Sequence, residues 1–337
     1  MKNKNKRKEC SDLFHRIKKR VIFFPTVVAM LLVIPPAFAE VNVADFLEWA
    51  TPLQIAKVEK TYDQALGEKV NWGFYSSGAK MAEAMVAGEI DIAFSQGMAP
   101  FVSAVNANAP IKIVGIAVAY DSADECMIRN ALGITKKNIK DLEGKKVAIP
   151  LKSMAEFGFR MTMRYLDVDI NKLELIDQNP ADAAFMMLET EVAAACAFGQ
   201  NSISKMKRVG KPILTAAEKK DAGIISFDVI SVTEKFAREK PEALRRFLKV
   251  TAEANAAFAR DKSKINVIAK DAGLTPERAM AQITGFTFPT VEEQLNAYFS
   301  EDGLATRLLP FMGKMFATDE FPEKSDYSKY IDTSFLK

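Results

Sequence analysis

Two acidic residues interrupt apolar sequence, and they are the side chains best suited to bind a charged group. Asp228 lies within the apolar segment 224–230, and Glu125 precedes the apolar residues 126–128. A carboxylate within an apolar strand is costly unless it is paired. The pairing partner is either a group of the protein itself, in a salt bridge or helix cap, or the ammonium group of a bound ligand.

Aromatic residues near these acids suggest how such a cation could be enclosed. Trp49, Tyr120 and Phe227 could form the walls of a cation site, because aromatic faces attract ammonium groups. Packing in an apolar core is the alternative interpretation for each ring.

Three predicted strand-to-helix junctions offer small residues and backbone N–H donors. Such donors suit an oxyanion, for example a sulfonate or a carboxylate, although an ordinary turn has the same sequence pattern. The junctions cover residues 95–99, 151–155 and 198–202, and their candidate ligand-binding residues are Gln96, Gly97, Met98, Ser153, Met154, Phe198 and Gln200.

Histidine usage argues against the commonest catalytic machinery. The single histidine, His15, lies in the N-terminal 39 residues. The remaining chain therefore has no Ser-His-Asp or Cys-His pair and no histidine-based zinc site. No paired-acid motif suggests carboxylate catalysis, so we expect a protein that is not an enzyme and that has no metal or cofactor.

Short apolar strands alternate with amphipathic helices over the first two thirds of the chain. The pattern predicts βαβ units and a parallel sheet covered on both faces. Expected strands are 41–47, 70–75, 90–94, 111–120, 146–150, 173–177 and 191–198, and expected helices are 52–66, 78–87, 100–106, 154–165 and 181–188. From residue 240 onward the spacing of apolar residues predicts helices.

The N-terminus has the three parts of a secretory signal peptide. A basic segment is followed by an apolar run, 21–35, and then by Ala37-Phe38-Ala39. We expect cleavage after Ala39 and a periplasmic product. Without these residues the chain has 37 basic and 41 acidic residues, which gives no reason to expect nucleic-acid binding.

Two cysteines, Cys126 and Cys196, remain after residue 39. They could pair in an oxidising compartment. Both lie in apolar, strand-like sequence, so buried free thiols are the favoured interpretation.

Several short blocks resemble one family, the periplasmic taurine and alkanesulfonate binding proteins of ABC transporters. The resemblance extends from residue 51 to residue 335, and the taurine-binding member is the most similar. The matching blocks are 84–92, 144–150, Phe227-Asp228-Val229 and the C-terminal Asp326-Tyr327-Ser328-Lys329-Tyr330.

The resemblance implies an α/β, two-lobed periplasmic binding protein of type II-like fold, with its ligand in the cleft between lobes. Lobe 1 would comprise residues 40–126 and 227–337, and lobe 2 residues 127–226. By matched position, Gln96, Gly97 and Ser153 would face a sulfonate, and Glu125 and Asp228 would lie near an amine.

The sequence departs from the taurine-binding pattern at the second-lobe junctions. Met154 and Ala155 stand where the taurine binder has hydroxyl residues, Glu156 replaces a histidine, and residues 198–201 replace a tryptophan-containing block. Fewer hydroxyls and an added negative charge would weaken sulfonate binding if these side chains face the cleft.

The expected function is capture of taurine or a related amino-sulfonate and its delivery, as a monomer, to an ABC permease in the inner membrane, which works with an ATPase. One alternative is a cationic amine or amino acid held by Glu125, Glu156 and Asp228. Another is a sensory ligand-binding module.

Overall fold

The computed structural model describes residues 40–120 and 123–337, so the predicted signal segment lies outside the described part. The first of its two sheets has the strand order β11-β4-β10-β3-β1-β2. These strands are β1 (Glu40–Asp45), β2 (Lys69–Phe74), β3 (Ile92–Gly97), β4 (Ile111–Tyr120), β10 (Ser226–Thr233) and β11 (Phe286–Thr287).

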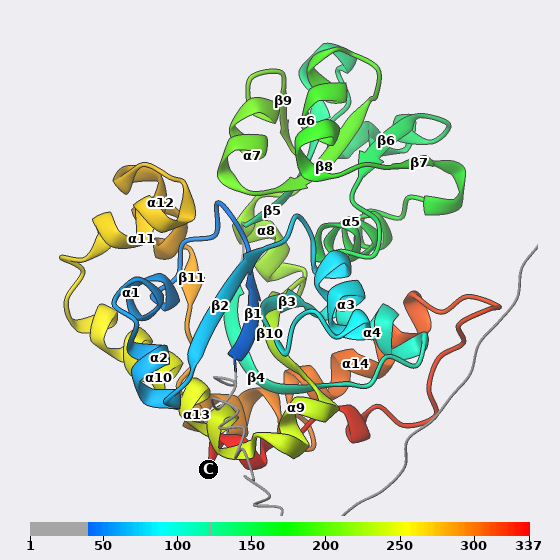
Figure 1. The fold of residues 1–337 in the computed structure, drawn as a ribbon. Helices are drawn as coiled ribbons and strands as arrows, with labels where there is room; N and C mark the ends of the chain where they lie inside the picture. Colours follow the sequence, from blue (N-terminus) through cyan, green and yellow to red (C-terminus); the bar gives the residue numbers. More distant parts are fainter. Residues whose placement is uncertain (1–39, 121–122) are drawn as a thin grey trace, which may run out of the picture. The chain divides into compact units, whose positions relative to one another are not determined.

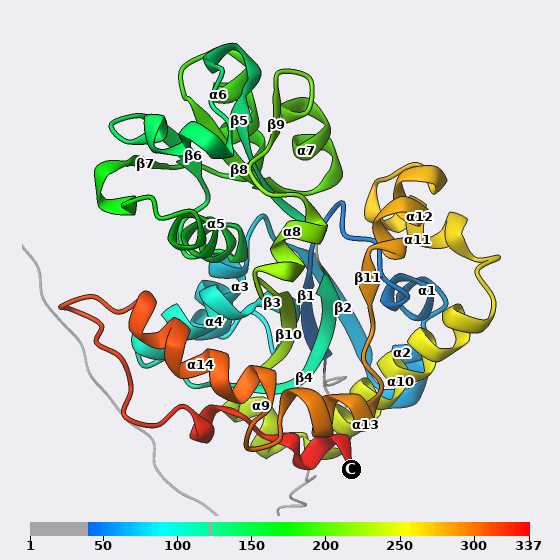
Figure 2. The same ribbon diagram turned by 180° about the vertical axis from the view of Figure 1, so that it is seen from behind.

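The second sheet has the order β7-β6-β8-β5-β9. Its strands are β5 (Asp124–Arg129), β6 (Lys146–Ile149), β7 (Glu174–Asp177), β8 (Ala194–Phe198) and β9 (Gly210–Pro212). The chain thus leaves the first sheet after β4, builds the second sheet, and returns to the first through β10. Figure 2 shows both sheets from behind, with the green second-sheet segment gathered at one end.

Helices cover both faces of the first sheet. Successive strand residues point to opposite faces, and each face carries apolar side chains that pack against a layer of helices. One face packs on α3 (Gly78–Ala87), α4 (Met98–Asn106) and α14 (Leu304–Met315). The other packs on α1 (Leu53–Val58), α2 (Thr61–Leu66) and α10 (Pro241–Arg260). The remaining helices of this part are α9 (Glu234–Glu239), α11 (Ile265–Ala272), α12 (Pro276–Thr284) and α13 (Val291–Glu293), which a π-helix continues over Gln294–Tyr298.

The second sheet is also covered on both faces. Helix α5 (Met154–Tyr165) contributes to one core, and α6 (Pro180–Leu188) and α7 (Gln200–Met206) contribute to the other. Helix α8 (Ala216–Asp221) precedes the return to β10. Across the two parts of the fold, α3, β4 and α5 begin and end at the predicted residues.

The expectation of a parallel sheet is wrong, because both sheets are mixed. Strand β10 runs antiparallel to β3 and β4, and β5 runs antiparallel to β8 and β9. These are the strands next to the two passages between sheets, where no helical crossover of the βαβ type sets the direction.

The expectation of free thiols is also wrong, because Cys126 and Cys196 form a disulfide. Antiparallel pairing of β5 with β8 places the two residues directly opposite one another. Their Cα atoms are 4.0 Å apart, within reach of a bond that closes a sequence separation of 70. The disulfide joins two central strands of the second sheet.

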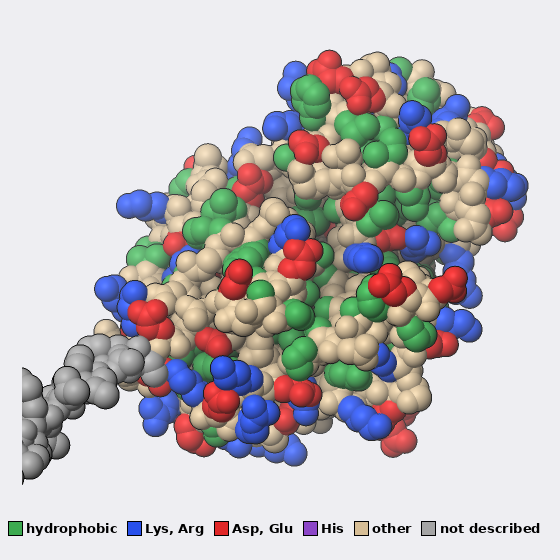
Figure 3. All heavy atoms as spheres, turned by 45° about the vertical axis from the view of Figure 1, so that its right-hand side comes forward, with side chains coloured by type: hydrophobic (Ala, Val, Ile, Leu, Met, Phe, Trp, Pro, Cys, Tyr) green, Lys and Arg blue, Asp and Glu red, His purple; other side chains and the backbone are tan. Residues whose placement is uncertain are grey.

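The surface carries charges of both signs. Figure 3 shows Lys and Arg side chains interspersed with Asp and Glu over one face, without a basic stripe. Within residues 40–120 and 123–337, no helix is long and apolar enough to cross a membrane.

Candidate functional site

A buried carboxylate, Asp228 on β10, is the centre of a polar network. Its Oδ1 accepts a hydrogen bond from the Tyr120 hydroxyl and its Oδ2 accepts one from the Ser95 hydroxyl, each at 2.9 Å. The Trp49 indole donates in turn to Ser95 Oγ at 2.8 Å. All four residues are at most 5% exposed. The two hydroxyl donors hold the carboxylate in one orientation, and neither of them is a cation.

A β-bulge next to Asp228 helps to aim its side chain. Asp228 pairs with Val118, but the following residue, Val229, pairs with Ile116, so one residue of β4 is unmatched. The Ile116 N–H donates instead to the side chain of Gln294, at 2.9 Å. Bulges of this kind bend a strand and redirect side chains, and they are common beside functional sites.

The network borders a cavity of about 40 Å³. A single water needs roughly 10–15 Å³ on the same measure, so the cavity has room for a small head group. Its walls come from both sheet segments and contain two carboxylates and four aromatic rings. The lining residues are Phe46, Trp49, Gly78, Ser95, Gly97, Tyr120, Asp124, Met154, Phe198 and Asp228. No Lys, Arg or His is among these residues, taken from the described chain.

The four rings contact one another edge to face around the cavity. The centroids of Phe198 and Phe46 are 6.2 Å apart, those of Phe46 and Trp49 are 6.4 Å apart, and those of Trp49 and Tyr120 are 5.4 Å apart. Interplanar angles between 63° and 84° make all three pairs T-shaped. Phe198 ends β8 of the second sheet, so the ring series connects the two sheet segments.

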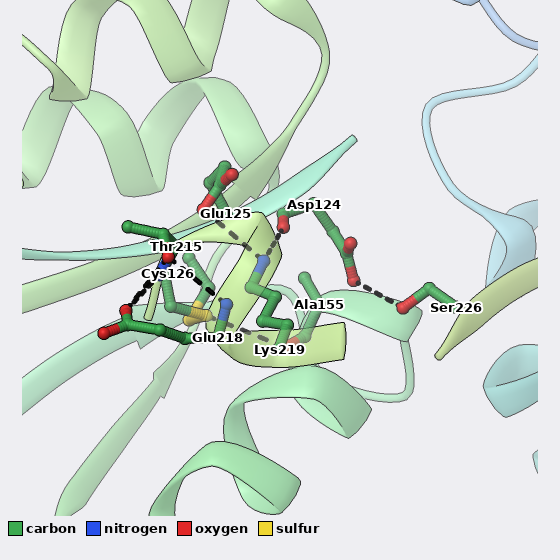
Figure 4. Close-up of polar contacts among 9 residues, drawn as sticks. Asp124, Glu125, Cys126, Ala155, Thr215, Glu218, Lys219 and Ser226 are labelled. Carbon is green, nitrogen blue, oxygen red and sulfur yellow. Dashed lines mark hydrogen bonds and ion pairs between the residues drawn. A yellow bond between two sulfur atoms is a disulfide. The ribbon is translucent and has the colours of Figure 1, made fainter. Parts of the chain in front are cut away.

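The second lining carboxylate, Asp124, begins β5 at the passage between the sheets. Its Oδ2 accepts a hydrogen bond from the Ser226 hydroxyl at 3.4 Å, which links the first residue of β5 to the first residue of β10 (Figure 4). Lys219 of α8 donates to the Asp124 backbone carbonyl at 2.7 Å and forms an ion pair with Glu125 at 3.4 Å. Glu125 is therefore paired inside the protein and is not among the residues that line the cavity.

Burial is the largest cause of the pKa shifts of the ionisable groups at the site. It raises the pKa of the Asp228 carboxyl to about 8, although the hydrogen bonds from Ser95 and Tyr120 act in the opposite direction. Burial also raises the pKa of Asp124, against the opposing effect of Lys219. The pKa of the Tyr120 phenol is well above its usual range because of burial and the neighbouring acids. A bound cation would offset the cost of ionising Asp228.

At the junction before α5, backbone N–H groups donate hydrogen bonds to carboxylates of the chain itself. Glu156, which is 3% exposed, accepts a hydrogen bond from the Lys152 backbone N–H at 2.5 Å. Asp177 accepts one from the Leu151 N–H at 3.0 Å. The Ser153 hydroxyl caps the helix by accepting from the Glu156 N–H, and it donates to the carbonyl of Pro150.

The junction before α7 holds a carboxylate from the other sheet segment. Glu48 accepts hydrogen bonds from the side chain and the backbone N–H of Asn201, at 2.6 and 3.2 Å. Arg278 of α12 donates to the Asn201 side-chain oxygen at 2.6 Å. Gly199 has φ of +82°, and a Cβ there would lie 3.2 Å from Glu48 Oε2, so glycine allows the carboxylate to approach.

Six of the residues predicted from the sequence line the cavity, and seven lie elsewhere. Those lining it are Trp49, Gly97, Tyr120, Met154, Phe198 and Asp228. Those outside its lining are Gln96, Met98, Glu125, Ser153, Glu156, Gln200 and Phe227. Ligand contact by any of them stays a prediction.

Several of the outlying residues have internal roles. Gln96 is fully buried, donates to the Gly78 carbonyl at 3.0 Å and accepts from the Ser231 hydroxyl. Met98 and Phe227 are both fully buried in the core beneath α3, α4 and α14. Gln200 is the first residue of α7 and is half-buried.

Four lining residues were missed by the sequence reasoning: Phe46, Gly78, Ser95 and Asp124. Ser95 precedes the predicted Gln96, and Asp124 precedes the predicted Glu125. Neighbouring residues of a strand point to opposite faces, so an error of one residue exchanges a cavity residue for a buried one. At β3 the regular alternation is also interrupted, because Ser95 has a φ of +62° and the pairing with β10 shifts register there.

The structure offers no metal site among its described residues, where no group of three or more His, Cys, Asp or Glu side chains converges. The cavity offers an oriented carboxylate and aromatic faces to a ligand.

Known proteins resemble this chain over most of its length. It is 20% identical over 299 residues to the taurine-binding periplasmic protein of Escherichia coli (strain K12), which covers 86% of this chain and 90% of the relative. It is 26% identical over 294 residues to the putative aliphatic sulfonates-binding protein of Bacillus subtilis (strain 168), covering 85% and 84% of the two chains.

A solved structure shows the same fold. The periplasmic aliphatic sulphonate binding protein SsuA of Escherichia coli superposes with a TM-score of 0.68 at 19% identity, over 88% of this chain and 98% of the other. This likeness confirms the predicted fold class. Residues 51–264, more than half of the sequence, match the family described as NMT1/THI5 like, and the chain belongs to that family.

Proposed function

We propose that the protein is the periplasmic solute-binding component of an ABC importer and that its ligand carries a protonated amine. The observation that carries the proposal is the buried Asp228 carboxylate, which borders an aromatic cavity and whose hydrogen-bond donors, among the described residues, are neutral. A buried carboxylate in such surroundings is costly unless a cation pairs with it. A ligand ammonium group supplies that cation.

The arrangement also supports a mechanism of capture. We propose two lobes, residues 40–126 with 227–337 and residues 127–226, with crossings near Met127 and Phe227. Contacts between a ligand and both cavity walls would favour the arrangement in which the lobes meet. The loaded protein would then deliver its ligand, as a monomer, to a permease.

Two ligand classes carry the required amine. The first class is taurine and related amino-sulfonates, suggested by the relatives, which are a taurine-binding periplasmic protein and a putative aliphatic sulfonates-binding protein. Organic cations without an anionic group are the second candidate, favoured by a cavity lining that contains two carboxylates and, in the described chain, no basic side chain.

Thermal unfolding of the purified protein with added amines, amino-sulfonates and sulfonates tests the proposal. A ligand that binds only the folded state raises the unfolding midpoint once its concentration exceeds its Kd. We expect an ammonium-bearing compound to raise the midpoint of the wild type and not that of Asp228→Asn. The matched control is Asp302→Asn, which changes an exposed aspartate outside the cavity lining. If sulfonates without an amine bind as well as amines do, the proposed role of Asp228 is wrong.

A further inference from the structure

Resting on the proposed function, we infer that the ligand is an organic cation without an anionic group, because carboxylates of the chain lie at both second-lobe junctions and already accept backbone N–H groups there. The inference concerns the ligand class of the cavity bordered by Asp228 and not a second site. Its evidence is the position of three carboxylates, the orientation of Asp228 and the composition of the cavity wall.

The junctions before α5 and α7 are the places where an oxyanion would meet backbone N–H groups of the second sheet segment. At the first junction, Glu156 and Asp177 accept hydrogen bonds from the N–H groups of Lys152 and Leu151. At the second, Glu48 accepts the N–H of Asn201. A sulfonate approaching either junction would meet a carboxylate that already holds an N–H donor.

These carboxylates are held by further contacts, so they do not move away at little cost. Arg160 donates to Glu156 at 2.7 Å, one turn further along α5. The Asn201 side chain donates to Glu48 at 2.6 Å, and Arg278 orients that side chain through its oxygen. Displacing Glu48 or Glu156 with a sulfonate would break charge-assisted hydrogen bonds and bring like charges together.

The first sheet segment presents the Asp228 carboxylate to the cavity. Both Asp228 oxygens accept O–H groups, from Ser95 and Tyr120, which is the arrangement of a carboxylate that receives a cation. Asp228 Oδ1 lies 3.5 Å from the position of a Cβ at Gly97, the residue that precedes α4. The N-terminal end of α4 therefore has a carboxylate beside it as well.

The wall of the cavity suits an ammonium or alkylammonium head group. Phe46, Trp49, Tyr120 and Phe198 enclose it together with the two acids Asp124 and Asp228. Aromatic faces and carboxylates together bind organic ammonium ions, and desolvation strengthens the attraction to the rings. The volume of about 40 Å³ fits a small head group of this kind.

A set of four related compounds separates the charges of the ligand. Taurine has an ammonium and a sulfonate, 2-aminoethanol has the ammonium and a hydroxyl, isethionate has the sulfonate and a hydroxyl, and choline has a quaternary ammonium. The full-length exported protein is titrated with each compound by calorimetry and by thermal unfolding. We expect 2-aminoethanol or choline to bind roughly tenfold or more tightly than taurine, and isethionate not to bind.

Two charge variants give the inference a second, independent readout. Replacing Glu48 or Glu156 by glutamine keeps the size of the side chain and an acceptor oxygen but removes the negative charge. We expect the ratio of taurine affinity to 2-aminoethanol affinity to rise roughly tenfold in each variant, because the like-charge repulsion is lost. Glu189→Gln, at an exposed position after α6, is the matched control and should leave the ratio unchanged.

The possible outcomes are distinct. Tighter binding of taurine than of 2-aminoethanol by the wild type, with Asp228→Asn inactive, would overturn the inference and leave the proposed function intact. Binding of isethionate, or an unchanged affinity ratio in Glu48→Gln and Glu156→Gln, would also overturn it. If none of the four compounds binds, the proposed amine site itself is wrong, and the inference fails with it.

Discussion

The affinity of the protein for an organic cation should depend on pH through Asp228. Burial raises the pKa of this carboxyl to about 8 in the empty cavity, so at neutral pH most molecules hold a proton there. A cation binds the ionised form, and the apparent Kd is the intrinsic Kd divided by the ionised fraction. Binding therefore weakens as the pH falls below 8.

The magnitude follows from the printed pKa. With a pKa of about 8, roughly half of the molecules are ionised at pH 8 and about one in a hundred at pH 6. The apparent Kd should thus be about 50-fold larger at pH 6 than at pH 8. At pH 7 binding should release about 0.9 proton per ligand, because the bound cation stabilises the ionised carboxylate.

Calorimetry with choline measures both quantities, since the charge of choline does not change with pH. Titrations at pH 6, 7 and 8 give the Kd, and repeats in buffers of different ionisation enthalpy give the number of protons released. The other groups facing Asp228 are Tyr120, whose raised pKa keeps it neutral in this range, and Asp124, whose pKa is also raised. Asp124→Asn should preserve a pH dependence but move it to lower pH, because the charge of Asp124 contributes to the raised pKa of Asp228. A Kd that is constant from pH 6 to pH 8, without proton release, would refute the reasoning.

Three further predictions follow from the same contacts. A carboxyl whose folded-state pKa is raised stabilises the fold fully only below its unfolded pKa, and this contribution is lost as the pH rises to about 8. The unfolding midpoint of the ligand-free wild type should therefore decrease as the pH is raised from 5 to 8. Thermal scans should show a smaller decrease for Asp228→Asn. Tyr120→Phe removes one hydrogen bond to the Asp228 carboxylate, which is worth about 1.5–3 kcal/mol for a charged acceptor. Calorimetry at pH 7 should therefore find cation binding roughly tenfold or more weaker. An unchanged affinity would contradict the proposed role of Tyr120 as a donor to the ionised carboxylate. Replacing Cys126 and Cys196 together by alanine should lower the free energy of unfolding by about 4 kcal/mol for a loop of this length, measured by urea titration, with the reduced wild type matching the variant.

The local spacing of apolar residues was sufficient to predict the bounds of several helices and strands. Helices 78–87 and 154–165 and strand 111–120 begin and end where the sequence predicted. Their apolar spacing lies within each segment, and the N-caps Ser77 and Ser153 directly precede the two helices. The predicted helix over 52–66 is instead two helices separated at Lys60, which adopts a left-handed conformation with φ of +57°. No residue type at that position signals the break.

The direction of each strand, and which of its side chains face the cavity, could be known only from the tertiary structure. Asp228 and Trp49 were recognised as candidates because a carboxylate in an apolar segment and a large aromatic are visible in any register. Ser95 and Asp124 were not, because the choice between each of them and its neighbour depends on which side of the sheet the cavity occupies. That side is decided by strands distant in sequence.

What the sequence determined by itself is the class of protein: an exported-type N-terminus, α/β elements of the right lengths, no histidine beyond residue 39, and an acid within an apolar strand. What only the tertiary structure decided is which groups meet. Cys126 meets Cys196 across 70 residues, and Glu48 meets Asn201 across 153 residues. Such pairings depend on long-range register and packing, which local propensity and periodicity do not encode, and they determine which of the available charges remain for a ligand.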